Sequence, residues 1–171
     1  MGERRGASAA IAALLIVALA ACTPEAAPAP PPSPSVVSSE DAAFAAAEAT
    51  YRAYVDAVNA SRVGGRAFDP ELFLTGSALE GERRSQLEFD QLGIRLDGDL
   101  RLASMTVSRA SGVSLRSYVC LDVSNTRVLD EAGVDVTPKD REALLGLEVA
   151  FVRHGDATLI SESQARDDIC S

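Results

Sequence analysis

The stretch VSLRSYVCLDV, residues 113–123, decides the fold class because its side chains alternate between two kinds. Apolar or small residues stand at every second position, and the positions between them hold Arg116, Tyr118, Cys120 and Asp122. A period of two sends successive side chains to opposite faces of an extended chain, one facing a core and one facing solvent. The sequence therefore predicts a half-buried β-strand that continues toward Leu129.

Three further strands with a twofold pattern are predicted, at residues 94–109, 142–153 and 157–166. The first of them should be kinked or bulged at Asp97-Gly98-Asp99. The strand at 142–153 carries apolar side chains on one face, namely Leu145, Leu147, Val149 and Phe151. Together with the stretch at 113–129, these segments predict four strands.

The connections between the strands are mostly short. Ser111-Gly112 and His154-Gly155-Asp156 are typical of turns, while residues 130–141 form an acidic, proline-containing loop. A run of adjacent strands that follows helices is typical of an antiparallel sheet. We therefore expect the four strands to form one antiparallel sheet.

A helix is predicted before the strands. Ser38-Ser39-Glu40-Asp41 supplies capping side chains and negative charge for its first turn. Apolar side chains then recur at spacings of three and four, at Phe44, Ala47, Tyr51, Tyr54 and Val58. Asn59, Ser61 and Gly64-Gly65 favour its end.

Two shorter helices follow the first. Asp69-Pro70-Glu71 is typical of a helix start, with Asp as the cap and Pro at the first helical position. The next helix should run from about Ser77 to Leu92 and end at Gly93, with four side chains partly buried: Leu79, Leu87, Phe89 and Leu92. Helices followed by a run of strands predict an α+β domain, with the helices packed on one face of a curved, four-stranded antiparallel sheet.

The N-terminus predicts a secretory signal. Arg4 and Arg5 precede an apolar run, residues 9–21, which is shorter than the roughly 20 residues that cross a bilayer. Leu19-Ala20-Ala21-Cys22 is similar to the lipobox of bacterial lipoprotein precursors, residue for residue. This resemblance implies cleavage after Ala21 and acyl chains such as palmitate on Cys22. The alternative is an ordinary signal peptide cleaved at an A-x-A site, with Cys22 incidental.

These segments divide the chain into a signal peptide (1–21), a lipidated Cys22 with a Pro/Ala/Ser-rich linker (22–39) and a globular domain (40–171). Prolines recur through the linker, which favours an extended spacer over a packed segment. The formal net charge of the whole chain is −9. A negative field repels phosphate backbones, so nucleic acid is not expected as a partner and the membrane contact is expected to be the lipid on Cys22.

Two cysteines remain beside Cys22, namely Cys120 and Cys170. Outside the cytoplasm two such thiols usually pair, and a disulfide here would fix the C-terminal tail to the sheet. A redox pair or metal ligands are the alternatives, but the sequence holds no C-x-x-C motif and only one histidine.

Four features of the sequence form a recognisable pattern. They are the lipobox, the stretches ATYRAYVDAVN (49–59) and VCLDVS (119–124), and the cysteine near the end of the chain. This pattern resembles a group of lipoproteins from high-GC Gram-positive bacteria, which in turn resembles the nuclear transport factor 2-like superfamily. The resemblance covers roughly residues 40–171 and implies a cone of three helices wrapped by a curved antiparallel sheet. A cystatin-type domain, with one helix on a sheet, is the alternative. The superfamily includes ketosteroid isomerases, polyketide cyclases and dehydratases as well as proteins without activity, so the fold implies no single function.

The search for catalytic chemistry yields few candidates. His154 is the only histidine and lies in a predicted turn, and no Ser stands in a G-x-S-x-G motif. Isomerase-like enzymes of the resembled superfamily place an Asp or a His–Asp pair in the cone, where four residues of this chain are candidates: Asp56, Tyr51, Tyr54 and Tyr118. The two helix tyrosines belong to the apolar stripe, which favours core packing. No catalytic residue is therefore assigned.

Metal and cofactor sites are likewise not expected. The loop residues Asp130, Glu131, Asp135 and Asp140 lack the ligand order of an EF-hand, so a solvated acidic loop is favoured over a weak Ca²⁺ site. We expect a non-enzymatic domain of the cell envelope on the extracytoplasmic face. It would bind an envelope protein or a small apolar ligand, or form a homodimer through its sheet. The alternative is a small isomerase or dehydratase acting on an apolar ligand.

Overall fold

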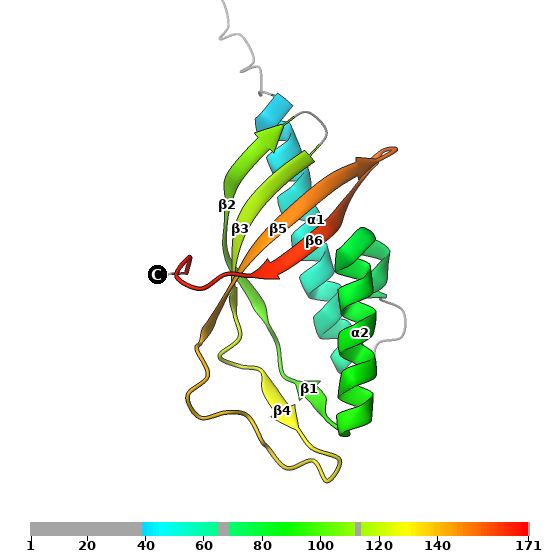
Figure 1. Cartoon of the computed structure of the whole chain (residues 1–171), viewed down its shortest axis with the longest axis vertical. Coiled ribbons are helices and arrows are strands. Elements are labelled where there is room, and N and C mark those ends of the chain that lie inside the picture. The colour runs from blue at the N-terminus through cyan, green and yellow to red at the C-terminus, as the bar shows by residue number, and fades with distance from the viewer. Residues whose placement is uncertain (1–38, 65–68, 112–113, 171) are drawn as a thin grey trace, which may run out of the picture. The chain divides into compact units, whose positions relative to one another are not determined.

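The computed structural model describes residues 39–64, 69–111 and 114–170, all within one compact unit, Val36–Ser171 (Figure 1). Helix α1 is Ser39–Arg62, a 3₁₀ helix η1 is Pro70–Phe73, and helix α2 is Gly76–Leu92. The six strands are β1 (Arg95–Asp97), β2 (Arg101–Ser111), β3 (Ser114–Asp122), β4 (Arg127–Leu129), β5 (Leu144–His154) and β6 (Ala157–Ala165). No helix among the described residues is long and apolar enough to cross a membrane.

The main sheet confirms the predicted α+β arrangement. Its four strands are antiparallel in the order β2-β3-β5-β6, and α1 lies along one face while α2 lies beside β6 (Figure 1). The three helix starts are close to those predicted. Asp69 caps η1 by accepting a hydrogen bond from the Glu71 amide at 2.9 Å, and Gly93 ends α2 with a left-handed φ of 62°.

The prediction of one long strand at 94–109 is wrong, because the chain leaves the main sheet at its N-terminal end. Gly98, with a φ of 79°, separates β1 from β2. The stretch predicted at 113–129 is likewise divided into β3 and β4 by a turn in which Asp122 Oδ1 accepts hydrogen bonds from the Ser124 amide and hydroxyl. The two short strands, β1 and β4, pair with each other in a second, antiparallel sheet.

The core lies between α1 and the main sheet. Tyr51 of α1 meets Phe151 of β5 edge to face, with ring centroids 6.3 Å apart. The predicted alternation holds in β3, where Leu115, Val119 and Leu121 are buried while Tyr118 faces the other way. These contacts join the apolar stripe of the first helix to the apolar face of the sheet.

Two side chains of α2 are more exposed than predicted. Leu87 and Leu92 are 61% and 65% exposed, and among the residues of α2 only Ala78 is buried. The reason is visible in Figure 1, where the second half of α2 extends past the main sheet toward β1. Leu79 and Phe89 are half-buried, as predicted.

Asn59 joins the end of α1 to the start of β2. Its side-chain amide donates to the Leu100 carbonyl at 2.8 Å, and its Oδ1 accepts from the Leu100 amide at 3.0 Å. Arg62, one turn later, donates from Nη1 to the Gly98 carbonyl at 2.9 Å. The C-terminal end of α1 is therefore fastened to the segment between β1 and β2.

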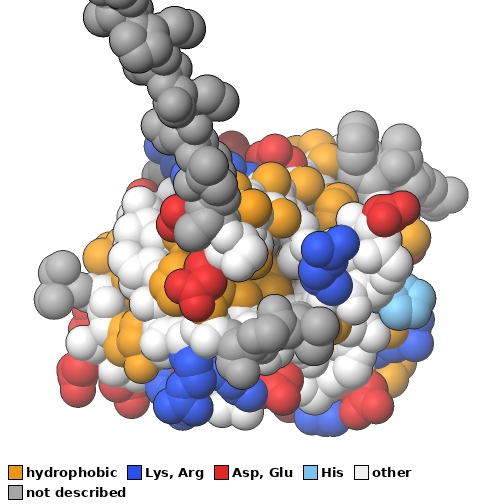
Figure 2. Space-filling model, turned by 90° about the horizontal axis from the view of Figure 1, so that it is seen from above, with side chains coloured by type: hydrophobic (Ala, Val, Ile, Leu, Met, Phe, Trp, Pro, Cys, Tyr) orange, Lys and Arg blue, Asp and Glu red, His pale blue; other side chains and the backbone are white. Residues whose placement is uncertain are grey.

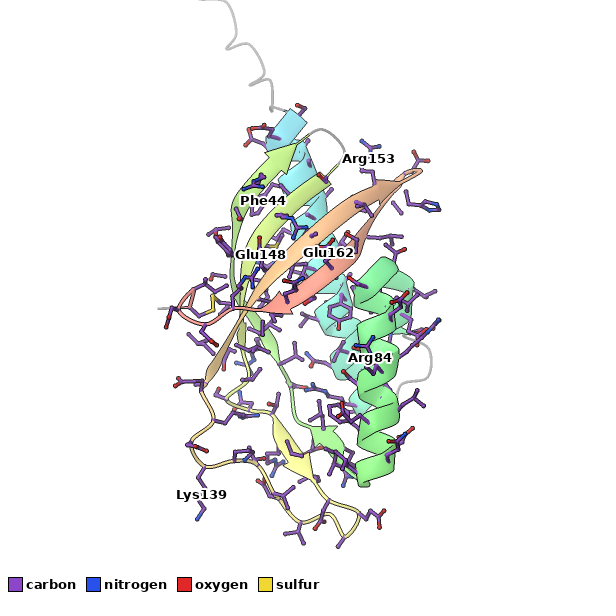
Figure 3. The ribbon with its side chains drawn as sticks, in the orientation of Figure 1. Phe44, Arg84, Lys139, Glu148, Arg153 and Glu162 are labelled. Carbon is purple, nitrogen blue, oxygen red and sulfur yellow. A yellow bond between two sulfur atoms is a disulfide. The ribbon has the colours of Figure 1, made fainter. Side chains whose placement is uncertain are left out.

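The predicted disulfide between Cys120 and Cys170 is present, with Cα atoms 5.6 Å apart, and Figure 3 shows its yellow sulfur bond at the C-terminal tail. The tail crosses the sheet at Gly146, whose register partner in β3 is Cys120. A Cβ at Gly146 would stand 2.4 Å from the Arg166 carbonyl oxygen, so the tail lies directly on the backbone of β5.

Ser117 provides a first prediction. It is fully buried in the core, and its hydroxyl has no hydrogen-bond partner among the described residues. Ser117→Ala removes a buried, unpaired polar atom, so we expect it to raise the unfolding free energy by about 1 kcal/mol. Urea denaturation measures the change. Ser104→Ala, at an exposed position of β2, is the control and should change stability little; a clear loss of stability in Ser117→Ala would contradict the prediction.

Candidate functional site

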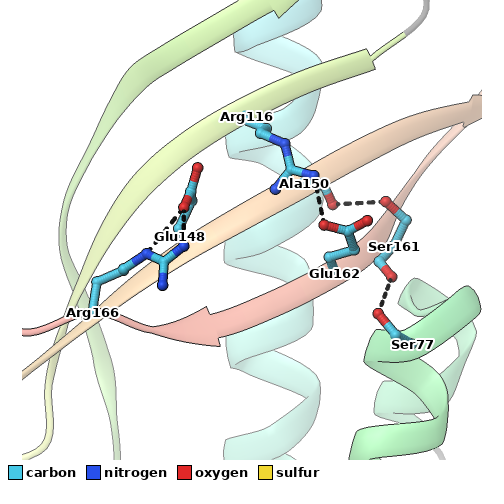
Figure 4. A network of polar contacts seen from close by, with 7 residues as sticks. All are labelled: Ser77, Arg116, Glu148, Ala150, Ser161, Glu162 and Arg166. Carbon is cyan, nitrogen blue, oxygen red and sulfur yellow. Dashed lines mark hydrogen bonds and ion pairs between the residues drawn. The ribbon is translucent and has the colours of Figure 1, made fainter.

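The outer face of the main sheet, opposite α1, is polar. Arg116 of β3 and Glu162 of β6 form an ion pair at 2.6 Å across β5, and Arg166 pairs with Glu148 at 2.8 Å (Figure 4). Part of this face is covered by the disulfide-bonded tail. We expected exposed apolar side chains on a sheet that serves for dimerisation, and this charged composition does not favour that use.

The edge of β6 is also occupied. The Thr75 amide donates to the Ile160 carbonyl at 2.8 Å, and the Ser77 hydroxyl donates to the Ser161 carbonyl at 3.3 Å (Figure 4). The edge at β2 is irregular, with two register shifts against β3. Irregular or covered edges discourage pairing with another strand.

A groove lies between α2 and the rest of the domain, and we define it by two adjoining cavities. The upper cavity, about 460 Å³, is lined by α2, α1 and the inner face of the main sheet. The lower cavity, about 480 Å³, lies between the C-terminal ends of α1 and α2 and β1. Four residues line both cavities: Tyr54, Glu82, Ser85 and Leu100. The cavities therefore meet beside these residues.

The groove exists because α2 turns small side chains toward the domain. Ala78, Gly81 and Ser85, at spacings of three and four, all line the upper cavity. A Cβ placed on Gly81 would meet no atom within 4 Å. The opposite wall of the upper cavity is apolar, with six aliphatic side chains: Leu74, Leu100, Leu121, Leu145, Leu147 and Ile160. Small residues on one wall and aliphatic ones on the other leave an open apolar space.

The junction of the two cavities holds a phenol and a carboxylate. The Tyr54 hydroxyl forms a hydrogen bond with Glu82, and Gln86 donates from Nε2 to Glu82 Oε1 at 3.1 Å. Burial, followed by the negative charge of Glu82, raises the pKa of Tyr54 well above its usual value. Tyr54 therefore stays neutral and acts as a hydrogen-bond donor.

Arg62 lies close to this junction and lines the lower cavity. Burial lowers the pKa of its guanidinium, while the carboxylates of Asp99, Glu82 and Asp97 oppose that shift. The side chain remains charged, since an arginine does not deprotonate in proteins. The groove thus combines the apolar wall of the upper cavity with partly buried charged groups where the two cavities meet.

The residues singled out from the sequence are spread over the molecule. Cys22 lies outside the described residues. Asp56 is exposed and lines neither cavity, and His154 is exposed at the β5–β6 turn, where it is visible in pale blue (Figure 2). Tyr118 is on the outer face of the sheet, while Tyr51 and Tyr54 line the upper cavity. The structure thus brings two of the three candidate tyrosines to the groove.

Two carboxylates of the acidic loop bind to the backbone of their own loop. Among the described residues, no three His, Cys, Asp or Glu side chains gather closely enough to hold a metal ion. Asp130 and Asp135 instead accept hydrogen bonds from backbone amides of their own loop, those of Val134 and Thr137. Lys139 lies in the same loop, on the side of the domain away from α2 (Figure 3).

Sequence reasoning missed Glu82 and Arg62. Glu82 is one of several glutamates on α2, and nothing in its immediate sequence distinguishes it from its neighbours. The available signal was the spacing of Ala78, Gly81 and Ser85. Small residues that are three and four positions apart lie on one face of a helix and leave room between that face and the neighbouring element. Arg62 follows the expected end of α1 and carried no signal.

No protein-family model matches this chain, and no curated protein matches it. Among solved structures, the chain is similar to the crystal structure of the intermembrane space region of the chloroplast protein ARC6. The identity is 16%, the TM-score is 0.47, and the match covers 70% of this chain and 92% of that chain. We base no argument on a likeness of this size.

Proposed function

We propose that this protein is a lipid-anchored protein of the cell envelope, held to the extracytoplasmic face of the membrane through Cys22, whose domain binds a small apolar ligand in the groove. The anchor is supported by the lipobox-like Leu19-Ala20-Ala21-Cys22 at the end of a short apolar run. The disulfide between Cys120 and Cys170 supports an oxidising location outside the cytoplasm.

The groove is the observation that carries the binding function. Ligand sites for small molecules are mostly apolar clefts of about 300–1,000 Å³ with a few placed polar groups. Both cavities fall in that range, and Tyr54 and Glu82 supply polar groups where they meet. A small ligand fits this shape better than a flat protein partner does, and the ion-paired outer face of the sheet gives no comparable support for a homodimer.

We further propose that the domain is a cone of the nuclear transport factor 2-like kind. Its support is the order of three helical segments followed by a curved antiparallel sheet, together with the sequence resemblance at 49–59 and 119–124. In such a cone the groove would be the open mouth.

Binding is favoured over catalysis because the sequence carries no recognisable catalytic motif and its one histidine, His154, is exposed and lines neither cavity. An isomerase of the kind considered above would need a carboxyl group in the groove with a raised pKa. Hydrogen bonds from Arg83, Ser124 and Thr137 lower the pKa of the Glu71, Asp122 and Asp135 carboxyl groups, and these three groups line neither cavity.

Native mass spectrometry of the unit Val36–Ser171, secreted under oxidising conditions, tests this function. We expect the mass of a monomer plus that of a small molecule. Organic extraction should remove this molecule, and the emptied domain should then bind a neutral apolar dye such as Nile red. A wild-type unit that carries no small molecule and binds no dye would contradict the proposal.

Gly81→Leu is the matched variant for this test. The new side chain enters open space beside the upper cavity, so we expect it to abolish dye binding. The unfolding free energy should stay equal or rise by about 1 kcal/mol, because glycine is unfavourable inside a helix. Gly81→Ala is the control, since a single methyl group leaves most of the cavity open and should preserve binding. Dye binding that is unchanged in Gly81→Leu would place the ligand elsewhere.

A further inference from the structure

We propose that the ligand of the groove is an elongated apolar molecule that ends in a hydrogen-bond donor, a hydroxyl or a protonated amine, and that Glu82 receives this donor. The inference rests on the proposed function and adds the chemical class of the ligand. It excludes fatty acids and lipids whose head group is an anion placed at this junction.

The two cavities extend in different directions from Glu82 and both offer apolar contacts. On the upper side the walls are aliphatic and aromatic, with Tyr51 and Leu147 among them. On the lower side the apolar contacts come from Val58, Phe89 and Ile94. An elongated body in either cavity therefore brings its end to the carboxylate at their junction.

Glu82 has acceptor capacity beyond its own contacts. A carboxylate accepts about four hydrogen bonds and donates none when it is ionised. The structure gives Glu82 two side-chain partners, Tyr54 and Gln86. A ligand group that completes this carboxylate must therefore be a donor, and a second carboxylate or a phosphate would face it oxygen to oxygen.

Glu82 and Arg62 are the two charged groups lining the groove that are partly buried, and Glu82 is the one that a ligand's donor can reach at the junction. Three carboxylates, those of Glu82, Asp97 and Asp99, lie close enough to influence the Arg62 guanidinium. Asp97 is paired with Arg127 at 2.8 Å, and Arg62 donates to the Gly98 carbonyl at 2.9 Å, while Glu82 forms no ion pair with any of the described residues. Arg84, Arg95, Glu88 and Asp90 also line the groove, but they are exposed and screened by solvent.

Isothermal titration calorimetry with three compounds of equal chain length tests the inference: dodecylamine, 1-dodecanol and dodecanoate, each below its micelle concentration at pH 7. The protein is the disulfide-bonded unit Val36–Ser171 after removal of any retained ligand. We expect dodecylamine to bind about tenfold more tightly than dodecanoate, the difference that a charge-assisted hydrogen bond supplies at a half-exposed site. Dodecanol should fall between them.

Glu82→Gln should weaken dodecylamine binding about tenfold and leave dodecanol binding nearly unchanged, because the amide oxygen still accepts a hydrogen bond from a neutral donor. Glu80→Gln is the matched control, since Glu80 is an exposed residue of α2 that lines neither cavity. It removes the same charge from the same helix and should leave the order of the three affinities intact.

The possible outcomes separate this inference from the proposed function. Equal affinities for the three compounds, tightest binding of dodecanoate, or an equal loss in Glu80→Gln and Glu82→Gln would overturn the inference while leaving the groove as a binding site. Absence of binding by all three compounds, together with no effect of Gly81→Leu on Nile red, would overturn the proposed function itself.

Discussion

Replacing Cys170 with serine should lower the free energy of unfolding by about 4 kcal/mol. Cys120 and Cys170 are 50 residues apart in the sequence, and the chain-entropy treatment of a cross-link assigns about 4 kcal/mol to a loop of that length. The loss should also free the tail from Gly146, whose carbonyl accepts a hydrogen bond from the Arg166 amide at 2.9 Å. For a unit of this size we expect the melting temperature to fall by roughly 10–20 °C.

Urea denaturation with and without dithiothreitol measures the effect. The wild-type unit should lose about the same stability when it is reduced, and Cys170→Ser should not respond to the reductant. Cys120→Ser provides a second route to the same broken bond. A reductant effect below about 1 kcal/mol in the wild type would show that the cross-link contributes little to the stability of the sheet.

Gly98 lies at the β1–β2 junction. Gly98→Ala should lower the free energy of unfolding by about 3–4 kcal/mol. A Cβ at this position would stand 2.0 Å from the Asn125 carbonyl oxygen, and the φ of 79° is one that alanine rarely adopts. The backbone of the β3–β4 turn must therefore move. The Gly98 carbonyl also accepts the hydrogen bond of Arg62, so the lower cavity should be disturbed as well.

Gly155→Ala separates the effect of the positive φ from the effect of the close contact with Asn125. Gly155 has a φ of 63°, but its Cβ would meet no atom within 4 Å, so only the backbone conformation is penalised. That penalty is about 1–2 kcal/mol. Thermal unfolding of both variants gives the comparison. If Gly98→Ala lowers the free energy of unfolding no more than Gly155→Ala does, the backbone near Asn125 moves away from the new Cβ without destabilising the domain.

The strand pattern was predictable wherever the alternation was strict. In β3 the period of two gave the correct buried face, because each inward side chain meets α1 or a neighbouring strand. The same holds for the apolar stripe on α1, which packs Tyr51 against Phe151. In these segments local sequence and tertiary packing impose the same requirement, so one can be inferred from the other.

The splitting of two strands was not predictable from pattern alone. Asp97-Gly98-Asp99 signals an irregularity, but a bulge and a departure from the sheet have the same local signature. The outcome depends on partners distant in the sequence: Asn59 fixes Leu100, and the Asn125 carbonyl lies against Gly98. The exposure of Leu87 and Leu92 has a similar origin, because the periodicity of α2 does not reveal where the sheet beside it ends.

The groove was only partly predictable. Tyr54 was proposed as a residue that could line a cavity in the expected cone, and it does line the groove. Its position in the apolar stripe of α1 nevertheless favoured burial in the hydrophobic core. What makes it part of a site is the absence of bulky side chains on the facing helix, at Ala78, Gly81 and Ser85. A gap between two elements is a property of their pairing, and neither element shows it by itself.

Helix α1 also sets a distance. Its first residue is Ser39, and its last residue, Arg62, lines the lower cavity. At 1.5 Å per residue the two ends are roughly 35 Å apart, about the thickness of a bilayer's hydrocarbon core. For a chain tethered ahead of Ser39, as proposed, the lower cavity would lie at the opposite end of α1 from the tether.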